Sequence, residues 1–231
     1  MAEPARQLVL DLPVEPRIEA EDFLVGPANA AAYGFLERWP AWPDRLAHLS
    51  GPPGSGKSHL AAIWAARAGA AIVPAGDVAA ERVPELARAD SLVLEDLDRG
   101  PPDERALFHL VNLARERNAF VLVTSVAPLE GCGIRTPDLL SRLRLAPSLR
   151  LGAPDDAFLR AMLVKLFLDR QLTVEANVVE YLAVRIERSA ARAASVVAEL
   201  DREALRQGRR VTRRMAATLL PDADSGGDEE G

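Results

Sequence analysis

Gly51-Pro-Pro-Gly-Ser-Gly-Lys-Ser58 is the stretch of this 231-residue chain that decides its fold and its chemistry. It matches the pattern G-x-x-x-x-G-K-[ST] at every fixed position, and such a loop closes its backbone N–H groups around phosphate oxygens. The lysine of the pattern reaches the β- and γ-phosphates, and the serine hydroxyl binds Mg²⁺. The pattern therefore predicts that a nucleotide contacts Gly51, Pro53, Gly54, Ser55, Gly56, Lys57, Ser58 and the next residue, His59. The alternative is a glycine-rich turn without a ligand.

Alternating strand and helix patterns surround the loop. Residues 46–49 are predicted to form a strand that enters it, and residues 59–67 a helix that leaves it. Buried or short strands are also predicted at 70–74, 91–94 and 120–124, and helices at 29–39 and 101–118. Strands that alternate with helices favour an α/β domain of three layers, αβα, with a parallel sheet.

The pattern changes after Gly152. Helices are predicted from 154 to about 169 and over about 175–187, 190–207 and 212–220, and no strand pattern competes with them. The predicted organisation is therefore a P-loop domain over 23–152 and a small all-helical lid domain over 153–221. Flexible segments are expected at 1–22, which is rich in Pro and Glu, and at 222–231, which is acidic and rich in Gly.

Composition limits the classes of function. A hydrophobic fraction of 48% with only 5% aromatic residues predicts a core of Leu, Val and Ala. The formal charge of −6 argues against a dedicated nucleic-acid binder. Cys132 is the only cysteine, so no internal disulfide and no multi-cysteine metal site can form. The sequence shows neither a signal-peptide pattern nor an apolar run of membrane-spanning length, so we expect a cytoplasmic protein.

Two strand ends carry the polar groups that nucleotide hydrolysis needs. Glu95 and Asp96 follow the strand at 91–94, where a carboxylate can join Ser58 in holding Mg²⁺ and the other can polarise the attacking water. Thr124 and Ser125 end the next strand, where a hydroxyl can sense the γ-phosphate or hold that water. An acidic turn and ordinary polarity at a strand end are the alternatives.

Arginines complete the set of candidate catalytic groups. Arg142, in Ser141-Arg142-Leu143, is placed to stabilise the transferred phosphoryl group in a neighbouring subunit's site. Arg192, early in a helix of the lid, is placed to fold back onto the phosphates, and Arg188 is the other candidate for that role. For each of them the alternative is an ordinary position on a solvated surface.

These motifs together resemble the AAA+ ATPases, and among them the DnaA family of replication initiators. The segment 23–29, Phe-Leu-Val-Gly-Pro-Ala-Asn, is similar to the family's nucleotide-entry motif, which implies that Leu24 and Val25 line the adenine. Residues 58–60, 141–143 and 188–192 resemble the family's loop end, arginine-finger box and second-sensor box. The resemblance covers about 23–220 and implies ADP or ATP with Mg²⁺ as the ligand.

The departures from that family concern DNA. The chain stops soon after the predicted lid, so we expect no helix-turn-helix domain. The segment 77–90 carries only Arg82 and Arg88 against four acidic residues, too few cations to gather many phosphates. Glu95 stands where the family has an aspartate, and its longer side chain implies weak intrinsic ATP hydrolysis.

An N-terminal motif points to a protein partner. Gln7-Leu-Val-Leu-Asp-Leu12 resembles the hexapeptide Q-L-x-L-x-L that binds the sliding clamp, with Leu8, Leu10 and Leu12 as its apolar residues and Gln7 as its hydrogen-bonding amide. A chance apolar patch is the alternative. With the DnaA-like core, the motif resembles the Hda (HdaA) type of regulatory inactivator within that family.

This resemblance implies two partners: the DNA-loaded β sliding clamp of DNA polymerase III, and DnaA. Arg142 would enter DnaA's nucleotide site in trans and stimulate ATP hydrolysis there, which prevents re-initiation of replication. A homodimer stays open, and neither sequence-specific DNA binding nor membrane association is expected. The alternatives are a helicase-loader-type AAA+ ATPase that acts on single-stranded DNA, and a scaffold with a degenerate nucleotide site.

Overall fold

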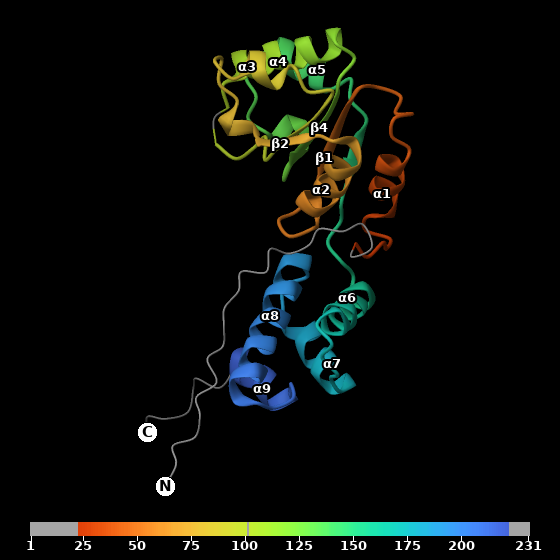
Figure 1. The fold of residues 1–231 in the computed structure, drawn as a ribbon, viewed down its shortest axis with the longest axis vertical. Coiled ribbons are helices and arrows are strands. Elements are labelled where there is room, and N and C mark those ends of the chain that lie inside the picture. The colour runs from red at the N-terminus through yellow and green to blue at the C-terminus, as the bar shows by residue number, and fades with distance from the viewer. Residues whose placement is uncertain (1–22, 101, 222–231) are drawn as a thin grey trace.

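The structure is a computed structural model that describes residues 23–100 and 102–221. The predicted clamp-binding residues Gln7, Leu8, Leu10 and Leu12 and the acidic segment 222–231 lie outside the described residues. The described chain forms a region built on a sheet and a region built of helices, one after the other along the long axis (Figure 1).

Five parallel strands form the described sheet, in the order β2-β3-β4-β1-β5. The strands are β1 (Leu46–Ser50), β2 (Ala71–Pro74), β3 (Ser91–Glu95), β4 (Phe120–Ser125) and β5 (Ser148–Arg150). The predicted parallel sheet and its first four strands are confirmed. The sequence did not predict β5, because it has three residues and Leu149 is its only apolar one.

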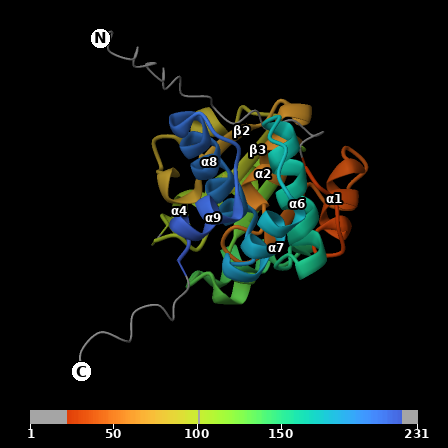
Figure 2. The same cartoon turned by 90° about the horizontal axis from the view of Figure 1, so that it is seen from below.

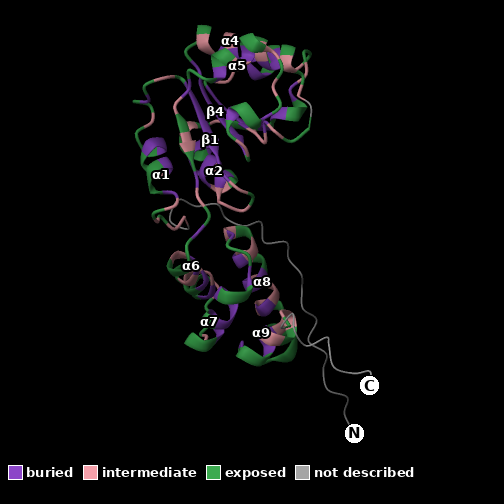
Figure 3. Ribbon diagram, turned by 180° about the vertical axis from the view of Figure 1, so that it is seen from behind, coloured by how far each residue is buried: buried purple, intermediate pink, exposed green. Residues whose placement is uncertain are grey.

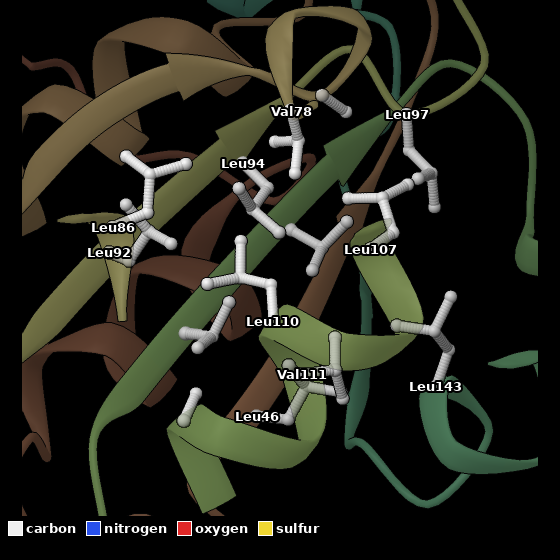
Figure 4. Packing of buried hydrophobic residues seen from close by; sticks show 14 of the residues in the cluster. Leu46, Val78, Leu86, Leu92, Leu94, Leu97, Leu107, Leu110, Val111 and Leu143 are labelled. Carbon is white, nitrogen blue, oxygen red and sulfur yellow. The ribbon is translucent and has the colours of Figure 1, made fainter. Parts of the chain in front are cut away.

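Alternation along the strands builds a separate core on each face of the sheet. Leu92 and Leu94 of β3 pack with helices on one face, while Val93 between them packs on the other. The first face is covered by α3 (Val83–Leu86), α4 (Glu104–Glu116) and α5 (Pro137–Leu143), and the second by α1 (Ala30–Glu37) and α2 (Lys57–Ala68). Figure 4 shows the packing of α4 on the first face, with Leu107, Leu110 and Val111 directed at the strands. The predicted three-layer αβα arrangement is therefore confirmed.

Short helices complete the connections. Two 3-10 helices, Ala75–Asp77 and Leu129–Gly131, follow β2 and β4. The sequence did not predict α5, the helix that carries Arg142, because seven residues are too few to show a clear helical period.

The helical region contains α6 (Asp156–Asp169), α7 (Ala176–Arg185), α8 (Ala190–Gln207) and α9 (Arg213–Leu219). Asp155, Ser189 and Thr212 cap the first turns of α6, α8 and α9 with their side-chain oxygens, and Gly208 ends α8 in the left-handed conformation. Buried side chains of these helices form a core of their own around Leu163, Leu182 and Leu200. Their buried residues face inward and their exposed ones outward (Figure 3).

Nowhere between residues 23 and 221, Pro101 aside, does the chain form a helix that combines the length and the apolar character needed to cross a membrane.

Candidate nucleotide-binding site

The phosphate loop connects β1 to α2 at the carboxyl edge of the sheet. Gly54 and Gly56 have φ angles of +70° and +96°, which favour glycine because a side chain would be strained there. The loop is tied to the sheet by Gly51, whose N–H donates a hydrogen bond of 3.2 Å to the Ser125 carbonyl. The glycines of the motif are therefore needed for the shape of the loop as well as for the approach of a ligand.

Lys57 is buried at the first position of α2, with 7% of its surface exposed. Its Nζ donates hydrogen bonds to the carbonyl oxygens of Gly51 (2.8 Å) and Pro52 (3.0 Å), on the inside of the loop. Burial lowers the pKa of this ammonium, and attraction by the Asp96, Asp98 and Glu95 carboxylates opposes that shift. Two neutral carbonyls partner this buried cation, and phosphate oxygens at the loop would supply an anionic partner.

The acidic edge of β3 carries a buried carboxylate oxygen with no partner. Oε1 of Glu95 is inaccessible to solvent and has no hydrogen-bond partner among the described residues. Asp96 has φ of +55°, and its carboxylate accepts a hydrogen bond of 3.0 Å from Arg99 Nη1. A buried oxygen of this kind needs a cation or a water molecule to satisfy it. Glu95, Asp96 and the exposed Ser58 hydroxyl offer oxygen atoms, the kind of ligand that Mg²⁺ prefers.

The two hydroxyls that end β4 have different surroundings. Thr124 Oγ1 accepts a hydrogen bond of 3.1 Å from the Asp96 N–H, so Thr124 positions the acidic edge. Ser125 is fully buried, donates from Oγ to the Ala127 carbonyl at 2.5 Å, and lies 2.7 Å from His48 Nε2. The Ser125 hydroxyl donates its single proton to the Ala127 carbonyl, so its oxygen accepts from the His48 imidazole. This assigns the His48 proton to Nε2.

A cavity of about 590 Å³ lies between the phosphate loop and the helical region. The residues that line it come from the entry segment, the loop with the start of α2, the link to the helical region, and α6 and α8: Phe23, Leu24, Ala28, Asn29, Ser55, Gly56, His59, Gly152, Pro154, Phe158, Met162, Lys165, Leu166, Asp169, Arg170, Ala190, Ala194 and Asp201. Its lining is mostly apolar and includes the aromatic rings of Phe23 and Phe158, which suits a flat heterocycle. Ser55 and Gly56 are the loop residues that line it.

The helical region contacts the phosphate loop directly. The Ala190 N–H at the start of α8 donates a hydrogen bond of 2.9 Å to the Gly54 carbonyl. A Cβ placed on Gly54 would lie 1.9 Å from Ser189 Oγ, so this contact requires glycine. The helical region therefore closes one side of the loop.

The cavity gathers only part of the predicted nucleotide-contacting set. Leu24, Ser55, Gly56 and His59 line it. Val25 is 46% exposed and does not line it. The other predicted residues of the loop, among them Lys57 and Ser58, do not line it.

Neither candidate lid arginine lines the cavity. Arg192 Nη1 lies 3.5 Å from Glu199 Oε1, and Arg188 Nη2 lies 2.7 Å from Asp156 Oδ1. In this arrangement both guanidinium groups pair with carboxylates of the helical region.

Sequence reasoning missed three residues that shape the site. Asn29 is buried and holds the entry segment, since its Oδ1 accepts from the Gly26 N–H (2.8 Å) and its Nδ2 donates to the Leu24 carbonyl (2.9 Å). Asp98 accepts hydrogen bonds from the N–H groups of Val126 and Ala127 and so fixes the chain after β4. Phe158 of α6 lines the cavity. Of these three residues, only Asn29 could have been found from the sequence, because an asparagine before a predicted helix is typical of an N-cap.

Arg142 and Arg144, at the C-terminal end of α5, have different surroundings. Arg144 forms an ion pair of 3.3 Å with Glu130. Arg142 is exposed on α5, does not line the cavity, and its side chain makes no hydrogen bond or ion pair within the described part of the chain. Its guanidinium is thus available to another molecule.

The fold of this chain is similar to those of several solved structures. Domain III of the Thermotoga maritima replication initiation protein DnaA superimposes with a TM-score of 0.79 at 18% identity, over 90% of this chain and 98% of that one. A replication initiator DnaA bound to AMPPCP and single-stranded DNA gives a TM-score of 0.70 at 18% identity, over 84% and 68%. A point variant of Thermotoga maritima RuvB gives a TM-score of 0.69 at 19% identity, over 89% and 73%.

No protein-family model matches the sequence, and no curated protein matches it either. The structural neighbours share the fold of this chain, which is a parallel five-stranded αβα domain followed by a helical region. The chain therefore has this three-layer αβα architecture, with a glycine-rich loop at the carboxyl edge of its sheet.

Proposed function

We propose that this chain binds ADP or ATP with Mg²⁺ between its sheet region and its helical region. The observation that carries the proposal is the phosphate loop, with left-handed Gly54 and Gly56 and buried Lys57, opening onto a cavity that the helical region closes. Solved DnaA structures of the same fold hold AMPPCP, an ATP analogue, which supports an adenine nucleotide here.

Within this proposal Ser58, Glu95 and Asp96 hold the Mg²⁺ ion, which would neutralise phosphate charge when it is bound. Thr124 fixes the Asp96 backbone, and Lys57 exchanges its loop carbonyls for phosphate oxygens. Glu95 in place of the aspartate expected from the DnaA resemblance changes the reach toward Mg²⁺, so we infer weak intrinsic hydrolysis.

We further propose that the chain acts as a DnaA-related regulator, through Arg142. An exposed arginine without an internal partner, outside its own cavity, suits insertion into another ATPase's site, where its planar charge stabilises the transferred phosphoryl group. DnaA is the proposed recipient and the β sliding clamp the proposed docking partner, with Gln7, Leu8, Leu10 and Leu12 as the clamp-binding residues.

A hydrolysis assay with ATP-bound DnaA and DNA-loaded clamp tests this role. The wild-type chain should raise the DnaA rate, and omission of the clamp should reduce the effect. Arg142→Ala should return the rate to the basal rate of DnaA, whereas the matched control Arg144→Ala should leave the stimulation in place. Stimulation that survives Arg142→Ala would remove the proposed role of this residue.

The helicase-loader alternative is supported by the DnaA neighbour bound to single-stranded DNA. In this chain the connection between β2 and β3 is short: α3 has four residues, and Arg82 Nη1 donates to the Asp77 carbonyl at 3.1 Å. The loader would be favoured if the chain binds single-stranded DNA and turns over ATP vigorously. Arg82→Ala and Arg88→Ala should then abolish the binding of the single strand.

A further inference from the structure

An arginine-rich segment extends from the second half of α8 into the first turn of α9. Residues 202–214 contain six arginines and one glutamate, a formal charge of +5 in a chain whose total is −6. The segment covers the C-terminal end of α8 and the start of α9, at the end of the helical region that is farthest from the sheet (Figures 1 and 2). It is separate from the nucleotide cavity, whose lining includes none of these residues.

These arginines surround a hollow of about 920 Å³, and we call this the arginine surface. It is lined by Arg202, Arg206, Arg209, Arg210 and Arg214. All five are exposed. Apart from Arg206, their side chains form no hydrogen bond or ion pair with any other residue that the structure describes.

Two carboxylates also line the hollow, and both already have partners. Glu203 accepts from Arg206 Nη2 at 2.9 Å and from Gln207, and Glu199 accepts from Ser195 Oγ at 2.8 Å. The carboxylates therefore do not neutralise the remaining arginines, and the hollow carries net positive charge.

The requirements of the fold do not account for this charge. Cations are favourable at the C-terminal end of a helix, which is where Arg206 lies on α8. Arg214, which lines the hollow, occupies the first turn of α9, where the helix dipole disfavours cations and no acidic residue offsets it. Arg213 in the same turn lies over the Tyr181 ring, 5.5 Å from its centroid, and does not line the hollow. Positive charge kept at an unfavourable place indicates an external anion.

The side chains that line the hollow determine which kind of anion it can bind. Guanidinium groups match phosphate oxygens in geometry, and a row of them suits a chain of phosphates. No aromatic side chain lines the hollow among the described residues, so it lacks the aromatic platform on which single-strand binders stack successive bases. We propose that the arginine surface binds the phosphate backbone of duplex DNA without reading its sequence, a property beyond nucleotide binding and beyond the stimulation of another ATPase.

Fluorescence anisotropy with a labelled duplex of about 20 base pairs, at salt concentrations from about 50 to 200 mM, tests the proposal. The full chain should bind, with log K falling linearly against log salt. Arg209→Ala/Arg210→Ala should weaken binding and reduce the magnitude of the slope by about 1.8, since each lost phosphate contact is worth about 0.9. Arg209→Lys/Arg210→Lys keeps both charges and should retain most of the slope.

The control is Arg105→Ala/Arg150→Ala, which removes the same charge from exposed positions of the described sheet region that have no side-chain partner there, and it should leave the slope unchanged. Thermal melts establish that each variant is folded, and nucleotide binding by all of them should equal that of the wild type. The proposal is overturned if the wild-type chain shows no salt-dependent duplex binding, or if the control lowers the slope as much as the Arg209/Arg210 pair. Tighter binding of a single strand, or capture of polyglutamate in place of duplex, would equally overturn it and assign the surface to another anion.

Discussion

His48 makes the stability of the sheet region depend on pH. It lies in the middle of β1 with 1% of its surface exposed, and its Nε2 bonds to Ser125 while its Nδ1 lies 3.4 Å from Ser148 Oγ. Burial lowers the pKa of this imidazole from 6.5 to about 4, although attraction by the Asp98 and Glu130 carboxylates opposes the shift. The folded protein therefore keeps His48 neutral at pH values where the unfolded chain protonates it.

The sign and size of the effect follow from these two pKa values. Below pH 6.5 the unfolded state binds more protons than the folded state, so acid favours unfolding. Stability that is fully present above pH 6.5 is lost as the pH falls toward 4. The two pKa values give a loss of about 2 kcal/mol at pH 5 and about 3 kcal/mol at pH 4 from this residue alone.

Urea denaturation of the wild type and of His48→Asn at pH 7 and pH 5 measures this contribution. The wild type should lose about 2 kcal/mol more than the variant between the two pH values, because the other titrating groups are common to both. His109→Asn is the matched control, since His109 is exposed on α4, and it should behave like the wild type. Equal losses in the wild type and in His48→Asn would refute the assignment of a buried neutral imidazole.

Three further substitutions have defined outcomes. Gly54→Ala should lower the melting temperature and weaken nucleotide binding, because a left-handed alanine costs about 1–2 kcal/mol and its Cβ would also collide with Ser189. As its control, Gly69→Ala should show only the backbone cost in the same melts, since φ is +61° there and nothing lies within 4 Å of the added Cβ. Thr124→Val should cost about 1–3 kcal/mol in urea titrations, by leaving the Asp96 N–H without its acceptor, and should reduce Mg²⁺-dependent nucleotide affinity. Leu163→Ala should cost about 2–5 kcal/mol in urea titrations, because its side chain is fully buried in the helical core.

Local signals in the sequence predicted most of the elements. The buried strands read as apolar runs, because both faces of a parallel sheet are covered. The predicted bounds of α8, about 190 and 207, agree with the structure, where Ser189 caps the start of the helix and Gly208 ends it. By contrast, β5 has three residues with a single apolar side chain, and α5 has only seven residues, so neither is long enough to show a clear period.

The site was harder to predict, because its geometry comes from residues far apart in the chain. The glycines, lysine and serine of the loop belong to one local motif. Ser125 was predicted as a hydroxyl near the phosphates, but its partner is His48, 77 positions earlier, and no sequence pattern links the two. Arg192 was predicted to face the phosphates, yet the cavity-lining face of α8 contains Ala190 and Ala194, and Arg192 lies elsewhere on the helix, beside Glu199.

Calorimetric titration of nucleotide-free protein with ADP and with ATP, each with Mg²⁺, tests most directly whether an adenine nucleotide binds between the two regions. The wild-type chain should bind. Lys57→Ala, with an unchanged circular dichroism spectrum, should bind about 10- to 100-fold more weakly, because hydrogen bonds to a charged group are worth about 1.5–3 kcal/mol. If folded wild-type protein gives no binding heat with either nucleotide, or if Lys57→Ala binds as tightly as the wild type, the account of this site is wrong.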